Sequence, residues 1–287
     1  MDRYWISSST SNFNNTANWS NTSGGSGGYS VPGTDSTAHY DGNGIGSCYF
    51  DIPVNVAGLQ LLSGYTGTVD QSGLYTSING SSSFNAGTFY GNYANIQCSG
   101  PLTLNGGTLI GTDGTLSILS SFTRTSGTFT ANNGIVSLDA SGAYISVASD
   151  SSFSTLQCNA VDARINGYIS VLNLVLTSGS LGKISDATVY AKANVYCAPD
   201  YNSWGLDNNI PMIMDGTGLQ KIYNTSGGVL PSLFINKEDT TQVVCEGTGP
   251  LQVRGDFCIK DGTFNSNGLD IWVGLRNFSD KSRAIFV

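Results

Sequence analysis

The sequence predicts an all-β protein in which coils of about 20 residues stack as a solenoid. Three observations predict this fold class. Short runs alternate apolar with polar residues, Gly- and Asn-rich turns separate the runs, and one six-residue pattern recurs along the chain. No stretch sustains the helical period of about 3.6 residues, so we expect very little helix.

The recurring pattern has a bulky apolar residue first, Leu or Ile fourth, and Cys, Leu or Ile sixth. It occurs in Val56–Leu61, Tyr93–Cys98, Phe153–Cys158, Ile169–Leu174 and Leu230–Ile235. The fourth positions are Leu59, Ile96, Leu156, Leu172 and Leu233. The gaps between them lie near one, two or three multiples of about 20 residues, so we expect one inward-facing strand position that is visited on successive coils.

Composition agrees with a folded β-protein and argues against nucleic acid as a partner. Hydrophobic residues make up 39% of the 287-residue chain, which has 37 Gly, and only 11% of residues are charged. The net charge is −8, and the 12 Lys and Arg residues form no cluster. Binding to a phosphate backbone needs a basic patch, which this sequence lacks.

The six cysteines are predicted to be reduced and structural. They stand at positions 48, 98, 158, 197, 245 and 258, without the C-x-x-C spacing of zinc or redox motifs. Cys98 and Cys158 occupy a pattern position where Ile235 stands in another copy, which favours a small buried apolar side chain. If three coils separate the two thiols, they lie about 14 Å apart, too far for a disulfide.

We divide the chain into an irregular cap or anchor segment, residues 1–50, and a β-solenoid, residues 51–287. The first segment is rich in Trp and Gly, and four of its residues are candidates for the cap or for docking onto a larger assembly: Trp5, Trp19, Tyr29 and Pro32. An inserted loop is expected near residues 197–210. Its Tyr201 and Trp204 either pack the loop against the solenoid or contact a glycan or a partner protein.

No catalytic, cofactor or metal site is predicted, and we expect no enzymatic activity. The single histidine, His39, cannot by itself build a triad or a multi-histidine metal site. Paired carboxylates of a glycan depolymerase would have to come from residues such as Asp186, Asp215, Asp239 and Asp256, which we interpret as turn residues. The segment Asp41–Gly46 resembles a calcium loop, but Ile45 and Ile52 occupy ligand positions.

Several segments together resemble a known group of proteins. They are Tyr4-Trp5, Asn18-Trp19-Ser, the Gly-rich run 22–28, Ser30-Val-Pro, Tyr40-Asp-Gly, Ser63-Gly-Tyr-Thr-Gly-Thr, Ser126-Gly-Thr-Phe and Asp215-Gly-Thr-Gly. Most of the chain thereby resembles β-solenoid proteins of tailed-bacteriophage virions, with related repeat modules in bacterial surface proteins. The resemblance implies a right-handed parallel β-helix on the surface of a particle or cell, and it transfers no catalytic residues.

The function expected from this resemblance is a non-enzymatic structural component of a bacteriophage virion. Such a head fibre, decoration, tail fibre or spike protein would contact other virion proteins, form a homo-oligomer such as a trimer, and act as a rigid shaft. The alternatives are a tailspike that binds or depolymerises a host surface glycan, and a bacterial surface adhesin.

The expected location is the virion, made in the host cytoplasm. The N-terminal residues contain no apolar run of signal-peptide length, and no stretch approaches the roughly 20 apolar residues of a membrane span. A Ser-, Thr- and Asn-rich surface without such a run suggests release by lysis, a mature fragment or a non-classical export route. We expect no insertion into a membrane.

Overall fold

The computed structural model describes residues 1–148, 151–203, 209–238 and 241–274. Their strands stack in parallel as coils of about 21 residues, which makes the protein an all-β solenoid. Among these residues helical structure is limited to the short 3-10 helix η1 (Thr16–Asn18) and to Ser203, which is also in 3-10 conformation. The predicted fold class, coil length and low helix content are therefore confirmed.

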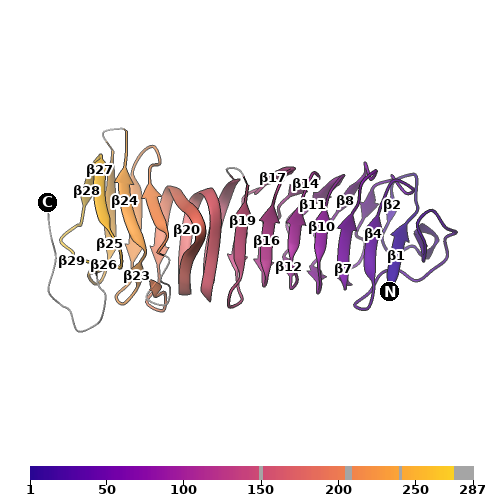
Figure 1. The fold of residues 1–287 in the computed structure, drawn as a ribbon, viewed down its shortest axis with the longest axis horizontal. Helices are drawn as coiled ribbons and strands as arrows, with labels where there is room; N and C mark the ends of the chain where they lie inside the picture. The colour runs from indigo at the N-terminus through magenta and orange to yellow at the C-terminus, as the bar shows by residue number, and fades with distance from the viewer. Residues whose placement is uncertain (149–150, 204–208, 239–240, 275–287) are drawn as a thin grey trace. The chain divides into compact units, whose positions relative to one another are not determined.

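The chain forms two compact units, Met1–Val136 and Ser137–Val287. Unit 1, all of which is described, contains three columns of parallel strands (Figure 1). The first column is β1 (Asp2–Trp5), β4 (Thr37–Tyr40), β7 (Gly58–Leu61), β10 (Ser82–Phe84), β13 (Leu102–Leu104) and β16 (Ser121–Arg124). The second is β6 (Val54–Val56), β9 (Thr76–Ile78), β12 (Ile96–Cys98) and β15 (Thr115–Ile118).

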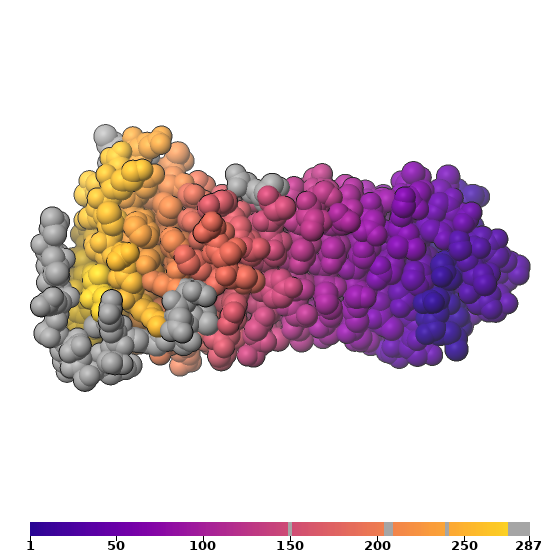
Figure 2. Space-filling model, in the orientation of Figure 1, coloured from indigo at the N-terminus to yellow at the C-terminus, as the bar shows by residue number. Residues whose placement is uncertain are grey.

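The third column is β2 (Ser11–Asn12), β5 (Cys48–Tyr49), β8 (Thr68–Asp70), β11 (Thr88–Tyr90), β14 (Thr108–Ile110) and β17 (Thr128–Thr130). β3 (Trp19–Ser20) pairs with β1 in the antiparallel sense. β18 (Ile135–Leu138) contains the last residues of unit 1 and the first of unit 2. Each colour of unit 1 forms a band in Figure 2, because each coil pairs with the coils that precede and follow it.

Successive coils of unit 1 are held in register by side chains that alternate inward and outward. Thr88 pairs with Thr68 on the preceding coil and with Thr108 on the next, and these threonines are only partly buried. The next residue on each strand points inward, so Val69, Phe89 and Leu109 stack as a buried ladder. Because every second residue of each strand points inward, the inward-facing residues of successive coils form an apolar column through the stack.

Cys98 is one rung of such a ladder. It pairs with Ile78 on one side and Ile118 on the other, and all three side chains are buried. All six cysteines are free thiols, and all but Cys258 are buried. The interpretation of Cys98 as an apolar rung is confirmed.

Strand pairing continues from the first residues into the later coils. Trp5 pairs with Tyr40, which pairs with Leu61, so the column of β1, β4 and β7 crosses the expected segment boundary near residue 50. Inside these first levels of the stack, Trp5, Trp19 and Tyr40 pack edge to face or tilted against one another. By strand pairing, residues 1–50 form the first two levels of the stack, because β1 pairs with β4 and β2 pairs with β5.

The strands of unit 2 also form three columns within its described residues. The first is β19 (Tyr144–Val147), β20 (Ser151–Cys197), β21 (Pro211–Met214), β24 (Ser232–Asn236) and β27 (Phe257–Asp261). The second is β20, β22 (Gln220–Asn224), β25 (Gln242–Gly247) and β28 (Thr263–Asn265). The third is β23 (Val229–Leu230), β26 (Leu251–Val253) and β29 (Ile271–Val273).

β20 has 47 residues, more than two coils of about 21, and therefore appears in two columns. Its first part keeps the sequence step seen from β8 to β17, since Tyr144 pairs with Arg164 just as Thr88 pairs with Thr108. Its end does not: Val189 pairs with Met212 and Val195 with Ile222, and both of these steps are longer. The coils of unit 2 therefore lengthen where the chain leaves β20.

The expectation that the recurring pattern marks one strand position is wrong. Leu59 lies on β7 in the first column, whereas Ile96 lies on β12 in the second. Leu172 is 53% exposed, although Val171 and Leu174 beside it are buried. The physical reason is that each coil contains several strands with the same alternation of apolar and polar residues, so the same pattern can occur on any of them. The alternation is also interrupted at the corners between strands.

Candidate functional site

Two of the residues expected to cap or dock the protein belong to its core. Trp5 and Trp19 are fully buried, with ring centroids 5.3 Å apart. Their indole N–H groups donate to the carbonyl oxygens of Gly46 and Phe13, at 2.9 and 2.8 Å. A docking contact through either indole is therefore excluded, because neither ring reaches the surface of the chain. Tyr29 is exposed and Pro32 is buried.

Of the two aromatic residues near residue 200 that were expected to contact a glycan or a partner, the structure describes only Tyr201. Tyr201 is fully buried, and its hydroxyl accepts the N–H of Leu181 at 3.2 Å. Burial raises the pKa of this hydroxyl well above its ordinary value. Tyr201 is therefore a core residue rather than a contact residue, and Trp204 lies outside the described residues.

The structure locates most of the titratable residues that were considered from the sequence. His39 stacks on Tyr4, and its Nε2 lies 3.0 Å from Asp2 Oδ1. Asp186 and Asp256 are exposed, and Asp239 is not among the described residues. No group of three or more His, Cys, Asp or Glu side chains gathers as metal ligands in the described part of the chain.

A hollow of about 360 Å³ on the outer face of unit 2 does bring aromatic and charged side chains together. Its described lining is Tyr168, Ser170, Tyr190, Lys192 and Asp215. We call it the Tyr168–Asp215 hollow. Alternation along β20 explains it, because Val189 and Ala191 are buried and the residues that follow each of them face outward.

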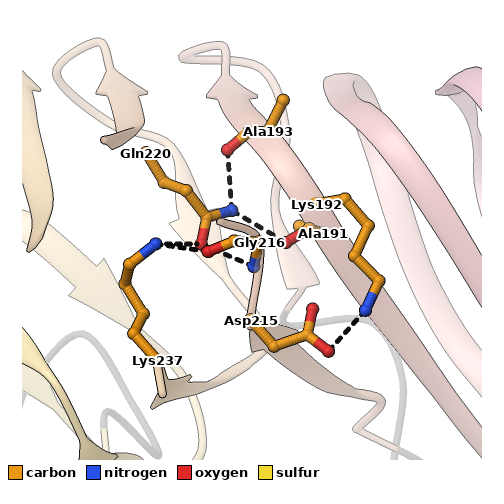
Figure 3. A network of polar contacts seen from close by, with 7 residues as sticks. All are labelled: Ala191, Lys192, Ala193, Asp215, Gly216, Gln220 and Lys237. Carbon is orange, nitrogen blue, oxygen red and sulfur yellow. Dashed lines mark hydrogen bonds and ion pairs between the residues drawn. The ribbon is translucent and has the colours of Figure 1, made fainter. Parts of the chain in front are cut away.

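An ion pair forms one wall of the hollow. Lys192 Nζ donates to Asp215 Oδ2 at 2.6 Å (Figure 3). The same Nζ lies 5.4 Å from the centroid of the Tyr190 ring. The second carboxylate oxygen, Asp215 Oδ1, is buried and accepts no hydrogen bond from the residues that the structure describes. A buried acceptor without a donor is unfavourable, so the Asp215 side chain is held in this position at a cost in free energy.

A buried polar network holds the backbone next to Asp215. Lys237, which is 1% exposed, donates from Nζ to the carbonyl oxygens of Gly216 and Gly218 and to Gln220 Oε1. Gln220 Nε2 in turn donates at 2.8 Å to the carbonyl oxygens of Ala191 and Ala193 on β20 (Figure 3). The turn that carries Asp215 is thereby tied to the strand that carries Lys192.

Sequence reasoning missed four of the five lining residues. Asp215 was considered only as one of several carboxylates, and Tyr168, Ser170, Tyr190 and Lys192 were not considered. A signal exists in the segments Tyr168-Ile-Ser170 and Tyr190-Ala-Lys192, which have the same form and lie about one coil apart in the sequence. Recognising it requires knowing the local coil length.

No protein-family model, curated protein or solved structure matches the chain. Among the described residues, no helix is both long and apolar enough to cross a membrane. The solenoid architecture and the Tyr168–Asp215 hollow are therefore the features from which a function has to be inferred.

Proposed function

We propose that the protein is a non-enzymatic structural component of a bacteriophage virion. In this role it is a rigid, surface-exposed shaft, such as a head fibre, a decoration protein or part of a tail fibre or spike. The observation that carries the proposal is the in-register stacking of coils within each unit, with buried apolar ladders and polar outer positions.

Rigidity follows from how the coils are bonded. Each inner strand of a column pairs with neighbours on both sides, and a parallel stack of this kind satisfies the backbone groups of its inner strands internally. Each inward rung also packs on the rung before and after it, so bending the stack would open apolar contacts. The resemblance to virion solenoids supports a location on the virion surface. There the protein would contact capsid or tail proteins and further copies of the chain.

The test locates the protein and its gene. Antibodies raised against the purified chain should label phage particles in immunogold electron microscopy, and capsid or tail genes should neighbour its gene. Labelling of bacterial cells in the absence of particles would instead support a surface adhesin and contradict the proposal. Light scattering of the purified protein would test the homo-oligomer, for which a trimer is proposed.

The non-enzymatic part of the proposal has its own test. The purified chain is incubated with capsular polysaccharide or lipopolysaccharide of candidate hosts, and new reducing ends are measured. We expect none. Release of oligosaccharides would contradict the proposed structural role and support a depolymerising spike.

A further inference from the structure

We propose that the Tyr168–Asp215 hollow binds one residue of a neutral saccharide, a pyranose with neighbouring hydroxyl groups, and does not cleave it. The inference concerns unit 2 alone and does not depend on the virion assignment. It goes beyond a shaft role because it gives the outer face of the stack a ligand.

The aromatic side chains suit the apolar face of a sugar ring. Tyr168 is 47% exposed, and the ring of Tyr190 lines the same hollow one coil away. A pyranose has a C–H face that packs on an aromatic ring and a rim of hydroxyl groups, which matches a site with an apolar body and a few polar groups. The volume of about 360 Å³ lies at the small end of ligand sites, which suits a single sugar residue.

The polar groups suit two adjacent hydroxyls. Asp215 Oδ2 accepts one N–H of Lys192, and its second lone pair can accept one sugar hydroxyl. An ammonium group has three N–H donors, of which Asp215 Oδ2 accepts one, so Lys192 Nζ can also donate to the neighbouring sugar oxygen. A carboxylate that accepts and an ammonium that donates, side by side, can therefore bind two adjacent sugar hydroxyl groups in one orientation.

The charges favour a neutral ligand. Lys192 and Asp215 form a pair 2.6 Å apart, so their charges largely cancel within the hollow. An acidic sugar would bring its carboxylate close to Asp215, and an amino sugar would bring its ammonium close to Lys192; both contacts are repulsive. The net charge of −8 further disfavours an acidic polysaccharide.

The hollow has the groups for binding but not for hydrolysis. Glycoside hydrolysis ordinarily uses two carboxyl groups that flank the scissile bond. Asp215 is the single carboxylate among the five described lining residues, and its Oδ2 is engaged by Lys192. The Lys237 and Gln220 network holds the backbone at Gly216, so the binding groups are positioned before a ligand arrives.

The experiment presents the full chain to an array of neutral, acidic and amino-sugar oligosaccharides, followed by calorimetric titration with the neutral ones that bind. We expect binding confined to neutral saccharides. Tyr168→Ala and Asp215→Asn should each weaken it about tenfold or more, because one removes the stacking ring and the other the charged acceptor. Tyr168→Phe keeps the ring and should bind within about threefold of the unaltered chain.

Tyr93→Ala is the matched control, because Tyr93 is another exposed tyrosine, on unit 1. It should leave binding unchanged, and circular dichroism of every variant checks that it folds. If Asp215→Asn fails to fold, the two variants of the half-exposed Tyr168 still test the proposal. No binding to any neutral saccharide, equal binding of acidic ones, or binding that survives Tyr168→Ala would overturn the proposal.

Discussion

Tyr196 and Tyr223 stack with their ring centroids 4.7 Å apart and their planes 9° apart. The two residues pair directly across β20 and β22, so their separation equals the spacing of neighbouring strands, about 4.7–4.9 Å. Lys221 and Glu246 add an ion pair of 2.8 Å beside this stack, on β22 and β25. The register between coils therefore fixes the positions of side chains on the outer face as well as those in the core.

The first prediction concerns this tyrosine stack. A double-mutant cycle with Tyr196→Ala and Tyr223→Ala should give a coupling free energy of about 0.5–1.5 kcal/mol, as for other aromatic pairs. Urea unfolding of the four proteins measures it. Strictly additive effects would mean that the rings do not interact in solution.

A second prediction tests which residues of the segment 169–174 face inward. Leu174→Ala should lower the free energy of unfolding by about 2–5 kcal/mol, because this leucine is buried and its removal leaves a cavity. Leu172→Ala, two residues away and exposed, should change it by no more than about 0.5 kcal/mol. Equal losses in thermal or urea unfolding would show that the assignment of faces is incorrect.

The third prediction concerns the buried lysine. Lys237→Met keeps the length of the side chain but removes the donors to Gly216, Gly218 and Gln220, so we expect a loss of about 2–4 kcal/mol in stability. Lys221→Met is the control, since Lys221 pairs with Glu246 at the surface, and it should leave the melting temperature unchanged. A Lys237→Met protein as stable as the unaltered chain would contradict a structural role for the network.

The fourth prediction is a loss of stability in alkali. Burial raises the pKa of the Cys98 thiol from 9.0 to about 12, so between these values the thiol ionises in the unfolded chain but not in the folded one. The stability present below pH 9 is then lost as the pH rises toward 12, by about 1.4 kcal/mol for this thiol one pH unit above the lower value.

Cys98→Val should remove this part of the pH dependence. Valine fits between Ile78 and Ile118, so stability near neutral pH should change by less than about 1.5 kcal/mol. Ile118→Val perturbs the same ladder without removing a thiol and is the control. The melting temperature is followed from neutral pH to about pH 11, and identical declines in all three proteins would refute the assignment.

Much of the fold can be predicted from the sequence because strand alternation is a local property. Val54 and Val56, and likewise Leu102 and Leu104, alternate with polar residues and are buried as that pattern indicates. The column to which a strand belongs is not local. Leu59 and Ile96 share a pattern but lie in different columns, since similar strands recur within every coil.

The candidate site was harder to predict because it depends on coil length. Lys192 and Asp215 meet because the sequence step there is longer than the steps from β8 to β17, as the pairing of Val189 with Met212 shows. Two aromatic residues were misinterpreted for a physical reason: Trp5 is followed closely by a run of serines and Tyr201 lies in a Pro- and Gly-flanked polar stretch, and both segments have the composition of surface loops. Both close over the core of their own coil, which only the folded backbone reveals.

The constant sequence step from β8 to β17 has an evolutionary consequence. From β8 to β17 each residue of a strand pairs with its counterpart at the same sequence step, as Thr68, Thr88, Thr108 and Thr128 show, and each coil touches only its neighbours. Duplication or deletion of one whole step would therefore preserve every surviving pair and shift the remainder by one strand spacing, about 4.8 Å. Recombination between repeats can set the reach of unit 1 in discrete increments, while point mutation tunes its surface independently.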